Sequence, residues 1–268
     1  MQDILQLSAA SDLEIPPQNR PERILIHLIS DLHLSPDRPE LLSQFNRFAG
    51  TLSAGDDLYI LGDLFEYWLG DDAVQFLGHG AVEQLLISLS GRGTQIFFLS
   101  GNRDFLLGQH FADRCGIELI SDEHVIQVGS RRVLLMHGDS LCTDDLPHQA
   151  FRKLVRSADW QRAFLDKSVA ERDGLAKLAR YRSQDDKAQK TMEIMDVNQQ
   201  AVEQVMHSHG VDTLIHGHTH RPAIHRWDSP HTAHRIVLGD WTPEPSWIQL
   251  SAAGAELAFS GNLQRLDF

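Results

Sequence analysis

The chain has 268 residues, of which 42% are hydrophobic and 23% charged, so it can bury a sizeable core as one large domain or two small ones. Its formal net charge of −13 argues against a general nucleic-acid-binding protein, which needs a broad basic surface. No apolar run approaches the roughly 20 residues of a membrane span. The two cysteines, Cys115 and Cys142, form no zinc or disulfide spacing and predict reduced thiols in a cytosolic protein.

The first 22 residues contain two adjacent prolines and few bulky apolar side chains. They lack the basic region followed by an apolar region that marks a signal peptide. We therefore expect a poorly ordered N-terminal extension over residues 1–22 and a single domain over residues 23–268.

From residue 24 onward, short apolar runs repeatedly end in glycine or in polar residues. The runs and the residues that follow them read ILIHLIS–DLH, LYIL–GD, IFFLS–GNRD, VLLM–HGD, TLI–HGHTH and IVL–GDW. Runs of this length that are rich in Ile, Leu and Val predict buried strands. Apolar residues at helical spacing over 39–50, 81–90 and 105–116 predict helices between the early strands. This alternation predicts an α/β layered fold whose strand ends gather along one edge.

The last third of the chain changes character and consists of short apolar runs separated by turn residues. Runs over 213–216, 223–227, 234–239, 246–251 and 255–260 predict strands. We expect these strands to form a second, partly antiparallel layer. Two sheets packed together, with helices outside, then account for the whole chain.

The polar residues at the predicted strand ends include two carboxylates, one amide and four imidazoles. They are Asp31, His33, Asp63, Asn102, His137, His216 and His218. Residues i and i+2 on a strand or its immediate extension point the same way, so Asp31 and His33 can face one ion. Seven donors exceed the needs of one ion and predict two ions joined by a bridging carboxylate. Imidazole with carboxylate suits Mn, Fe or Zn better than Mg or Ca, and we expect Mn²⁺.

The ordered motifs DxH, GD, GN, HGD and GHxH resemble those of the calcineurin-like metallophosphoesterases, and the likeness runs from Ile24 to His220. The resemblance implies a four-layer αββα sandwich with two metal ions. By matching motif positions, it implies a first ion held by Asp31, His33, Asp63 and His218. It implies a second ion held by Asp63, Asn102, His137 and His216, so that Asp63 is the bridge.

Where many members of that family have GNH, this chain has GNRD with Arg103. Arginine stays protonated near neutral pH and cannot act as a general acid, but it can clamp a phosphate and stabilise developing negative charge. The leaving group should therefore need little protonation, which favours a phosphoanhydride substrate over an alkyl phosphomonoester. In the alternative, Arg103 only binds phosphate and another histidine, such as His220, is the general acid.

Longer strings resemble the UDP-2,3-diacylglucosamine hydrolases, the pyrophosphatases of lipid A synthesis. These strings are GDLFEYWLGDD, GNRDFLLG, MHGDSLCTDD and MEIMDVNQ. The resemblance implies hydrolysis of UDP-2,3-diacylglucosamine to UMP and the lipid-sugar phosphate called lipid X. Our hypothesis for the mechanism is that a metal-activated water attacks the phosphorus nearer uridine. By matching positions, it implies substrate contacts from Asn102, Arg103, Asp145, Arg180, Ser183, Lys187, Lys190 and His216. It also implies that Asn102, Arg103 and His216 take part in catalysis.

Two residues in these strings raise separate expectations. The family often has a tyrosine where this chain has His148, which leaves a ring available for the sugar or phosphate. Cys142 has no evident partner for nucleophilic chemistry, so we expect it to be a packed thiol.

A helical insert is expected over residues 146–208, between the fourth and fifth motifs. Residues 148–190 within it hold 11 Lys and Arg against 6 Asp and Glu, a local charge of +5 in an otherwise acidic chain. A basic island of this kind suits an anionic ligand or an anionic membrane surface. Lys187 and Lys190, three residues apart, share one helix face.

The insert also carries apolar side chains at helical spacing, in groups such as Phe151 with Leu154 and Trp160 with Phe164. They predict either a helical cap packed on the core or one wall of an apolar chamber for acyl chains, and different helix faces can serve both. A stripe of Ile194, Val197, Ala201 and Val205 favours packing on the core.

Two other functions remain open at this point. A phosphodiesterase for a cyclic nucleotide or a nucleotide diphosphate would use the same scaffold without needing Lys187 or Lys190. A non-catalytic protein-binding scaffold would show gaps in the set of seven donors, and none is missing. With a lipid substrate, the basic insert predicts peripheral attachment to the cytoplasmic face of the inner membrane. We expect no nucleic-acid partner and no obligatory protein partner.

Overall fold

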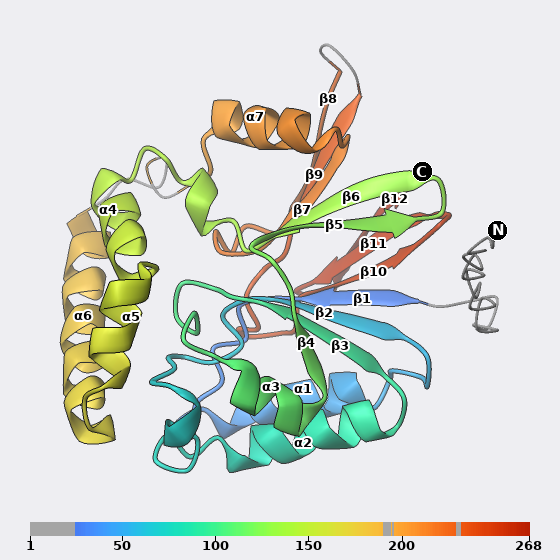
Figure 1. Ribbon diagram of the computed structural model, residues 1–268. Coiled ribbons are helices and arrows are strands. Elements are labelled where there is room, and N and C mark those ends of the chain that lie inside the picture. The colour runs from blue at the N-terminus through green and yellow to red at the C-terminus, as the bar shows by residue number, and fades with distance from the viewer. Residues whose placement is uncertain (1–24, 190–193, 195, 229–231) are drawn as a thin grey trace, which may run out of the picture.

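The computed structural model describes residues 25–189, 194, 196–228 and 232–268. The extension expected over residues 1–22 lies outside the described residues. Two β-sheets lie face to face at the centre of the described chain (Figure 1).

The larger sheet has seven strands in the order β12-β11-β10-β1-β2-β3-β4. Four of its strands run parallel: β1 (Ile26–Ile29), β2 (Asp57–Leu61), β3 (Gln95–Leu99) and β4 (Ile117–Leu119). The others extend it antiparallel from β1: β10 (Trp247–Ser251), β11 (Gly254–Phe259) and β12 (Asn262–Asp267). The prediction that the runs over 246–251 and 255–260 belong to the second layer is therefore wrong. Apolar alternation identifies a strand but does not say which free edge it joins, and here they join the edge of β1.

The smaller sheet has five strands in the order β5-β6-β7-β9-β8. Its strands are β5 (Glu123–Val128), β6 (Arg131–Met136), β7 (Thr213–His216), β8 (Ala223–Trp227) and β9 (Ala233–Val237). The central three, β6, β7 and β9, are parallel, so their carboxyl ends lie at one edge.

The alternation of side chains along the strands builds the layers. On β6, Val133 and Leu135 point into the core between the two sheets, whereas Leu134 packs beneath α7 (Gln199–His209). On β2, Tyr59 joins the core between the sheets, and Leu58 faces the outer helices. Strands buried on both faces read as continuous apolar runs, as the sequence showed.

Helices cover the outer face of each sheet and complete four layers (Figure 1). The larger sheet is covered by α1 (Pro39–Ala49), α2 (Gly80–Gly91) and α3 (Gln109–Cys115), and the smaller one by α7. Proline at the first position starts α1, and Gly116, at φ +66°, ends α3. The four-layer αββα sandwich is confirmed.

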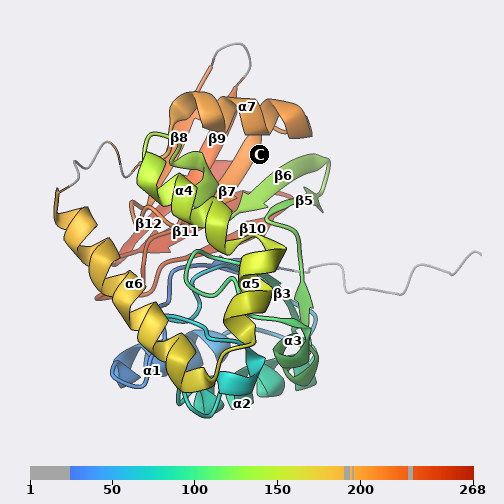
Figure 2. The same ribbon diagram turned by 60° about the vertical axis from the view of Figure 1, so that its left-hand side comes forward.

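Three further helices stand beside the strand ends rather than over a sheet face (Figure 1), and they come to the front when the molecule is turned (Figure 2). These are α4 (Leu146–Val155), α5 (Ala158–Leu165) and α6 (Val169–Gln189), called here the cap helices. Asp145 caps α4 by accepting from the His148 amide, and Ser157 caps α5 in the same way. Two short 3₁₀ turns, at Asp71–Ala73 and Asp139–Leu141, complete the described helical elements. No described helix is both long and apolar enough to cross a membrane.

The predicted insert over 146–208 spans two different structural settings. The cap helices lie at the strand ends, but α7 packs on the smaller sheet through Val202 and Met206. Val197, Ala201 and Val205 pack against the same cluster, as the apolar stripe predicted, whereas Ile194 is exposed.

Candidate metal centre and active site

The carboxyl ends of β1, β2 and β3 meet those of β6 and β7 at one edge of the sandwich. Asp31 and His33 follow β1, Asp63 follows β2, and Asn102 follows β3. From the other sheet, His137 follows β6, His216 ends β7, and His218 and His220 lie in the next loop. The structure therefore brings all the predicted strand-end donors to one region.

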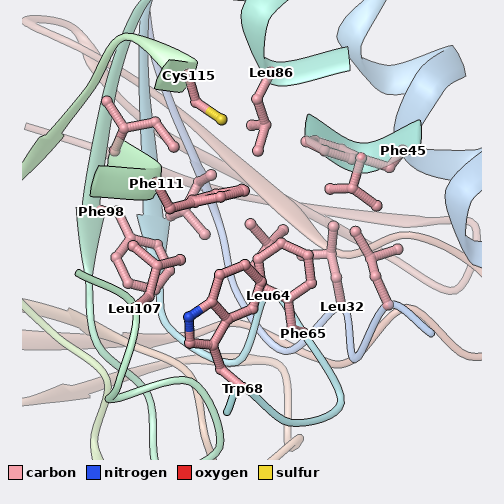
Figure 3. Packing of buried hydrophobic residues seen from close by; sticks show 14 of the residues in the cluster. Leu32, Phe45, Leu64, Phe65, Trp68, Leu86, Phe98, Leu107, Phe111 and Cys115 are labelled. Carbon is pink, nitrogen blue, oxygen red and sulfur yellow. The ribbon is translucent and has the colours of Figure 1, made fainter. Parts of the chain in front are cut away.

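Apolar residues between the donors anchor these loops in the core. Leu32, Leu64 and Phe65 are buried in the cluster beneath α1, α2 and α3 (Figure 3). Leu32 separates Asp31 from His33, so the loop alternates core-facing and site-facing side chains. Hydrogen bonds tie this loop to the next one, from the Asp31 amide to Gly62 O at 3.1 Å and from the His33 amide to Asp63 O at 3.0 Å.

Five non-glycine residues of the site have the left-handed backbone conformation. The φ angles are 57° at Asp31, 50° at His33, 52° at Asp63, 67° at His218 and 55° at His220. Positive φ is uncommon outside glycine, and Asp and His tolerate it better than most residues. Such residues persist only where the surrounding structure holds them, and they cluster at functional sites.

Two motif glycines, Gly62 and Gly217, lie where neighbouring loops come too close for a side chain. A Cβ on Gly62, which has φ +83°, would lie 2.4 Å from the Gly101 backbone nitrogen. A Cβ on Gly217 would lie 2.3 Å from Oδ2 of Asp31. The loops after β1, β2, β3 and β7 therefore contact each other with no room for a side chain.

Asp31 is held by two hydrogen bonds to one of its oxygens. Its Oδ2 accepts from the Ser30 hydroxyl at 2.6 Å and from the His218 amide at 2.8 Å. Its Oδ1 faces two imidazoles instead, at 3.2 Å from His220 Nε2 and 4.0 Å from His33 Nε2. Asp31, His33 and His220 thus place three donor atoms within 4.8 Å of one another.

A second group of donors shares Asp31 and adds Asp63 and His137, whose donor atoms also lie within 4.8 Å. His137 Nε2 is 3.8 Å from Asp63 Oδ1 and 3.0 Å from Asn102 Oδ1. Asn102 Oδ1 is also 2.9 Å from Nδ1 of His218. The predicted donors of both ions are therefore adjacent, apart from His216.

His216 is buried beside this group but turns its ring nitrogens elsewhere. Its Nδ1 is 2.8 Å from the carbonyl oxygen of Gly217, and its Nε2 is 3.3 Å from Nη1 of Arg235. Burial, with the positive charge of Arg235, lowers the pKa of His216 to about 3, so the ring stays neutral. His220, which the motif matching left without a role, lies closer to the carboxylates.

The donors fit divalent cations. Two carboxylates, Asp31 and Asp63, are buried side by side, at 0% and 2% exposure, which is costly unless cations pair with them. Burial, together with the nearby carboxylates of Asp104 and Asp31, raises the pKa of Asp63 to about 7. Nδ1 of His33 is buried and has no hydrogen-bond partner among the described residues. Paired carboxylates beside lone-pair-bearing imidazoles form the donor set that Mn, Fe or Zn prefers.

The charged state of the histidines supports the same conclusion. Burial keeps the pKa of His218 well below its usual value, and burial with the charge of Arg103 does the same for His33. Neutral imidazole is the form that binds metals. Burial acts to lower the pKa of His137, but Asp63 and Asp31 raise it to about 9. The two carboxylates beside His137 thus favour positive charge at this position, which a bound cation would supply.

The guanidinium group of Arg103 is held at the site by two carboxylates, those of Glu66 and Asp63. Its Nη1 is 2.6 Å from Glu66 Oε1, its Nε is 3.6 Å from Asp63 Oδ2, and its amide donates to Asp63 Oδ1 at 2.9 Å. Glu66 Oε1 also pairs with Nη2 of Arg180 on α6. Glu66 therefore links the arginine of the third motif to an arginine of the cap helices.

A pocket of about 610 Å³ opens from the donors toward the cap helices. At the donor end it is lined by Asn102, Arg103, His218 and His220. At the far end its wall is apolar and comes from both the core and the cap: Phe105, Leu106, Phe151, Trp160, Phe164 and Leu175. Polar and apolar groups thus share one continuous space.

The remaining predicted contact residues are placed differently. Asp145, Arg180 and His148 line the pocket, and the His148 ring stacks on that of His218 with centroids 5.5 Å apart. Ser183 and Lys187 lie on α6, at positions whose side chains are outside the described part, and Lys190 lies outside it altogether. Cys142 is buried, and burial raises the pKa of its thiol to about 12, as expected for a packed thiol.

The model of the calcineurin-like phosphoesterase family matches residues 24–222 of the chain. The chain belongs to this family. Its relatives include proteins named UDP-2,3-diacylglucosamine hydrolase. The one from Histophilus somni (strain 129Pt) is 45% identical over 84% of this chain and 96% of its own length. Those from Aromatoleum aromaticum and Escherichia coli O81 are 46% and 45% identical, over 86% and 85% of this chain and 94% and 96% of their own lengths.

Solved structures resemble this calcineurin-like phosphoesterase more distantly. A dimetal phosphatase from Danio rerio aligns over 91% of this chain and 98% of its own, with 14% identity and a TM-score of 0.46. A phosphoesterase from E. coli aligns over 91% and 99%, with 14% identity and a TM-score of 0.45.

Several residues that position the donors of this phosphoesterase were not predicted. Asp104 is fully buried and accepts from the amides of Leu64 at 2.7 Å, Gly101 at 2.9 Å and Asp63 at 3.2 Å. Asp104 could have been predicted to belong to the site because it lies two residues after Asn102 in the GNRD string. Glu66, three residues after Asp63, had no comparable signal, because its partners lie 37 and 114 positions away.

Proposed function

We propose that the protein hydrolyses the pyrophosphate bond of UDP-2,3-diacylglucosamine to give UMP and 2,3-diacylglucosamine 1-phosphate. The observation that carries this proposal is the continuous pocket in which donors for metal and phosphate meet an apolar wall of the cap helices. Relatives about 45% identical, matched over 94–96% of their own lengths, bear the name UDP-2,3-diacylglucosamine hydrolase. A substrate with a sugar phosphate and two acyl chains needs both ends of such a pocket.

We assign Asp31, His33, Asp63 and His218 to one divalent ion, and Asp63, Asn102, His137 and His216 to the other. The two ring nitrogens of His216 face Gly217 O and Arg235 Nη1, so this assignment requires the ring to turn toward the other donors when metal binds. Bound divalent ions supply a water activated at neutral pH and positive charge for the phosphoryl oxygens. Mn²⁺ is our proposal for the metal, supported by the mixture of imidazole and carboxylate.

Arg103 is assigned to the phosphoryl group on which charge develops. Its Glu66 partner holds the guanidinium at the donor end of the pocket, so the arginine is positioned before substrate arrives. A permanently charged arginine stabilises the anionic leaving group of an anhydride without transferring a proton. His220 lies within reach of Asp31 and Asp240, and it is the candidate for proton transfer if one is needed.

We further propose that the enzyme works at the cytoplasmic face of the inner membrane as a peripheral protein. The support is the local charge of +5 over residues 148–190, together with exposed apolar side chains on the same helices, including Phe151, Leu154, Leu175 and Leu178. Apolar side chains beside cations are the combination that binds anionic lipid surfaces.

The decisive experiment is hydrolysis of UDP-2,3-diacylglucosamine in ¹⁸O-labelled water with Mn²⁺, followed by mass spectrometry of both products. We expect cleavage with the label in UMP, because attack occurs at the phosphorus nearer uridine. Label in the sugar phosphate would show instead that water attacks the phosphorus nearer the sugar. If the lipid were not cleaved while a cyclic nucleotide was, the protein would instead be a phosphodiesterase on the same scaffold.

A further inference from the structure

A second pocket, of about 430 Å³, adjoins the active-site pocket, and its described lining includes no residue of the cap helices. Thr219 and Arg221, in the loop after β7, line both pockets. The second pocket continues along β8 and β9 through His225 and Arg235 and reaches Phe259 at the end of β11. A ligand at the metal donors can therefore extend in two directions, under the cap helices or past Thr219.

Among the described residues that line the second pocket, the permanently charged groups are more often cationic than anionic. Its lining holds two guanidinium groups, Arg221 and Arg235, and one carboxylate, Asp196. Asp196 Oδ2 lies 2.6 Å from Nη1 of Arg221, whereas Asp196 Oδ1 is 4.0 Å from Nη1 of Arg235. One carboxylate thus pairs closely with one arginine and leaves the second arginine only a distant counter-charge.

Polar atoms in the same lining lack partners. Arg235 is only 8% exposed, and its Nε has no hydrogen-bond partner among the described residues. The same is true of the Thr219 hydroxyl, which is buried between the two pockets. A buried polar atom without a partner is destabilising, and a ligand that supplied hydrogen-bond acceptors would offset part of that cost.

We propose that this second pocket binds the nucleoside monophosphate half of the substrate. The inference rests on the proposed function, in which the acyl chains occupy the apolar wall and the anhydride lies at the metal donors. The remaining half of such a substrate carries phosphate and carbonyl oxygens that suit Arg221, Arg235 and Thr219. Phe259 supplies an aromatic ring, the type of side chain on which bases stack.

The test uses the full-length chain and UMP as the probe. His225 is exposed in the wall of the second pocket, so His225→Glu adds an anion there without removing a core side chain. His110→Glu is the matched control, since His110 is also exposed but lies on α3, outside the lining of both pockets. Phe259→Leu is the second variant, because it keeps bulk and removes the ring.

UMP binding is measured by titration calorimetry with and without divalent ions, alongside inorganic phosphate and 2,3-diacylglucosamine 1-phosphate. We expect His225→Glu to weaken UMP about tenfold and to raise KM for UDP-2,3-diacylglucosamine similarly, because an added like charge opposes the phosphate. The lipid-sugar phosphate should bind both histidine variants equally. We expect Phe259→Leu to weaken UMP more than inorganic phosphate.

Equal UMP affinity in wild type, His225→Glu and Phe259→Leu would overturn the inference. The proposed hydrolysis would not be affected by that result, because the ¹⁸O experiment tests it separately. If inorganic phosphate matched UMP and Phe259→Leu had no effect, the pocket would be an anion site without nucleotide recognition. If UMP bound as expected but the lipid substrate were not cleaved, the proposed hydrolysis would fail while the nucleotide pocket survived.

Discussion

Removing the carboxylate of Asp104 should damage both the fold and the metal centre. Its two oxygens accept from four buried amides, and the two shortest hydrogen bonds are 2.7 Å to Leu64 and 2.9 Å to Gly101. Asp104→Ala leaves these amides without an acceptor. At about 1–3 kcal/mol for each buried amide left unsatisfied, the two shortest bonds alone predict a loss of about 2–6 kcal/mol in the free energy of unfolding.

The second expected effect is on metal binding. Asp104 touches no proposed ion, but it fixes the loops that carry Asp63 and Asn102. Losing such a supporting group typically weakens metal affinity about 10- to 100-fold. Asp104→Asn keeps one acceptor oxygen but turns its NH2 group toward the two amides that the other oxygen served, so it should also lower stability and metal affinity.

Urea unfolding of the metal-free chain measures the first effect, and calorimetric titration with Mn²⁺ measures the second. Asp113→Ala is the control, since Asp113 is exposed on α3 and should change stability by only about 0.5 kcal/mol. If Asp104→Ala lost less than about 1 kcal/mol and bound Mn²⁺ as tightly as wild type, the positioning role of Asp104 would be refuted.

Three further perturbations have distinct expected results. Glu66→Gln removes the charge that holds Arg103 and Arg180, so kcat/KM should fall about 10- to 100-fold, whereas exposed Glu203→Gln should leave kinetics unchanged. Burial lowers the pKa of His79 to about 4, so the folded chain resists protonation that the unfolded chain accepts below about 6.5. About 3 kcal/mol of stability should therefore disappear as pH falls from 6.5 to 4, and His79→Gln should flatten that part of a pH series of urea unfolding; identical curves would contradict this. Chelation with EDTA should abolish hydrolysis and Mn²⁺ should restore it, and activity that survives exhaustive chelation would exclude the proposed centre.

The position of the donors was predictable because it depends on local pattern. Each apolar run predicted a strand, and the residues that follow parallel strands must lie at the same edge of the sheet. The glycines of the GD and GH motifs were part of the same signal, since close contact between loops forbids a side chain at Gly62 and Gly217. The family resemblance implied the four layers, and the apolar runs independently predicted two packed sheets with helices outside.

The remaining features depend on contacts that no local pattern encodes. The strands β10 and β11 carry ordinary alternation, and only tertiary packing decides that they extend β1 rather than the smaller sheet. Glu66 and Arg235 act through partners far away in the chain, so neither residue is marked by its neighbours. The side-chain orientation of His216 toward Arg235 likewise depends on a partner supplied by another strand.

The left-handed backbone at five site residues also affects how ligands should be deleted in experiments. Asp31, His33 and Asp63 already carry a Cβ where φ is 50–57°, and alanine would keep that Cβ while it removes the donor. That conformation costs a typical L-residue about 1–2 kcal/mol, and Asp and His tolerate it better than alanine does, so an activity assay would count this difference as part of the loss of the ligand. Glycine accepts the same φ freely but also makes the unfolded chain more flexible, so urea unfolding of matched alanine and glycine variants is needed to separate the backbone contribution from the loss of the donor.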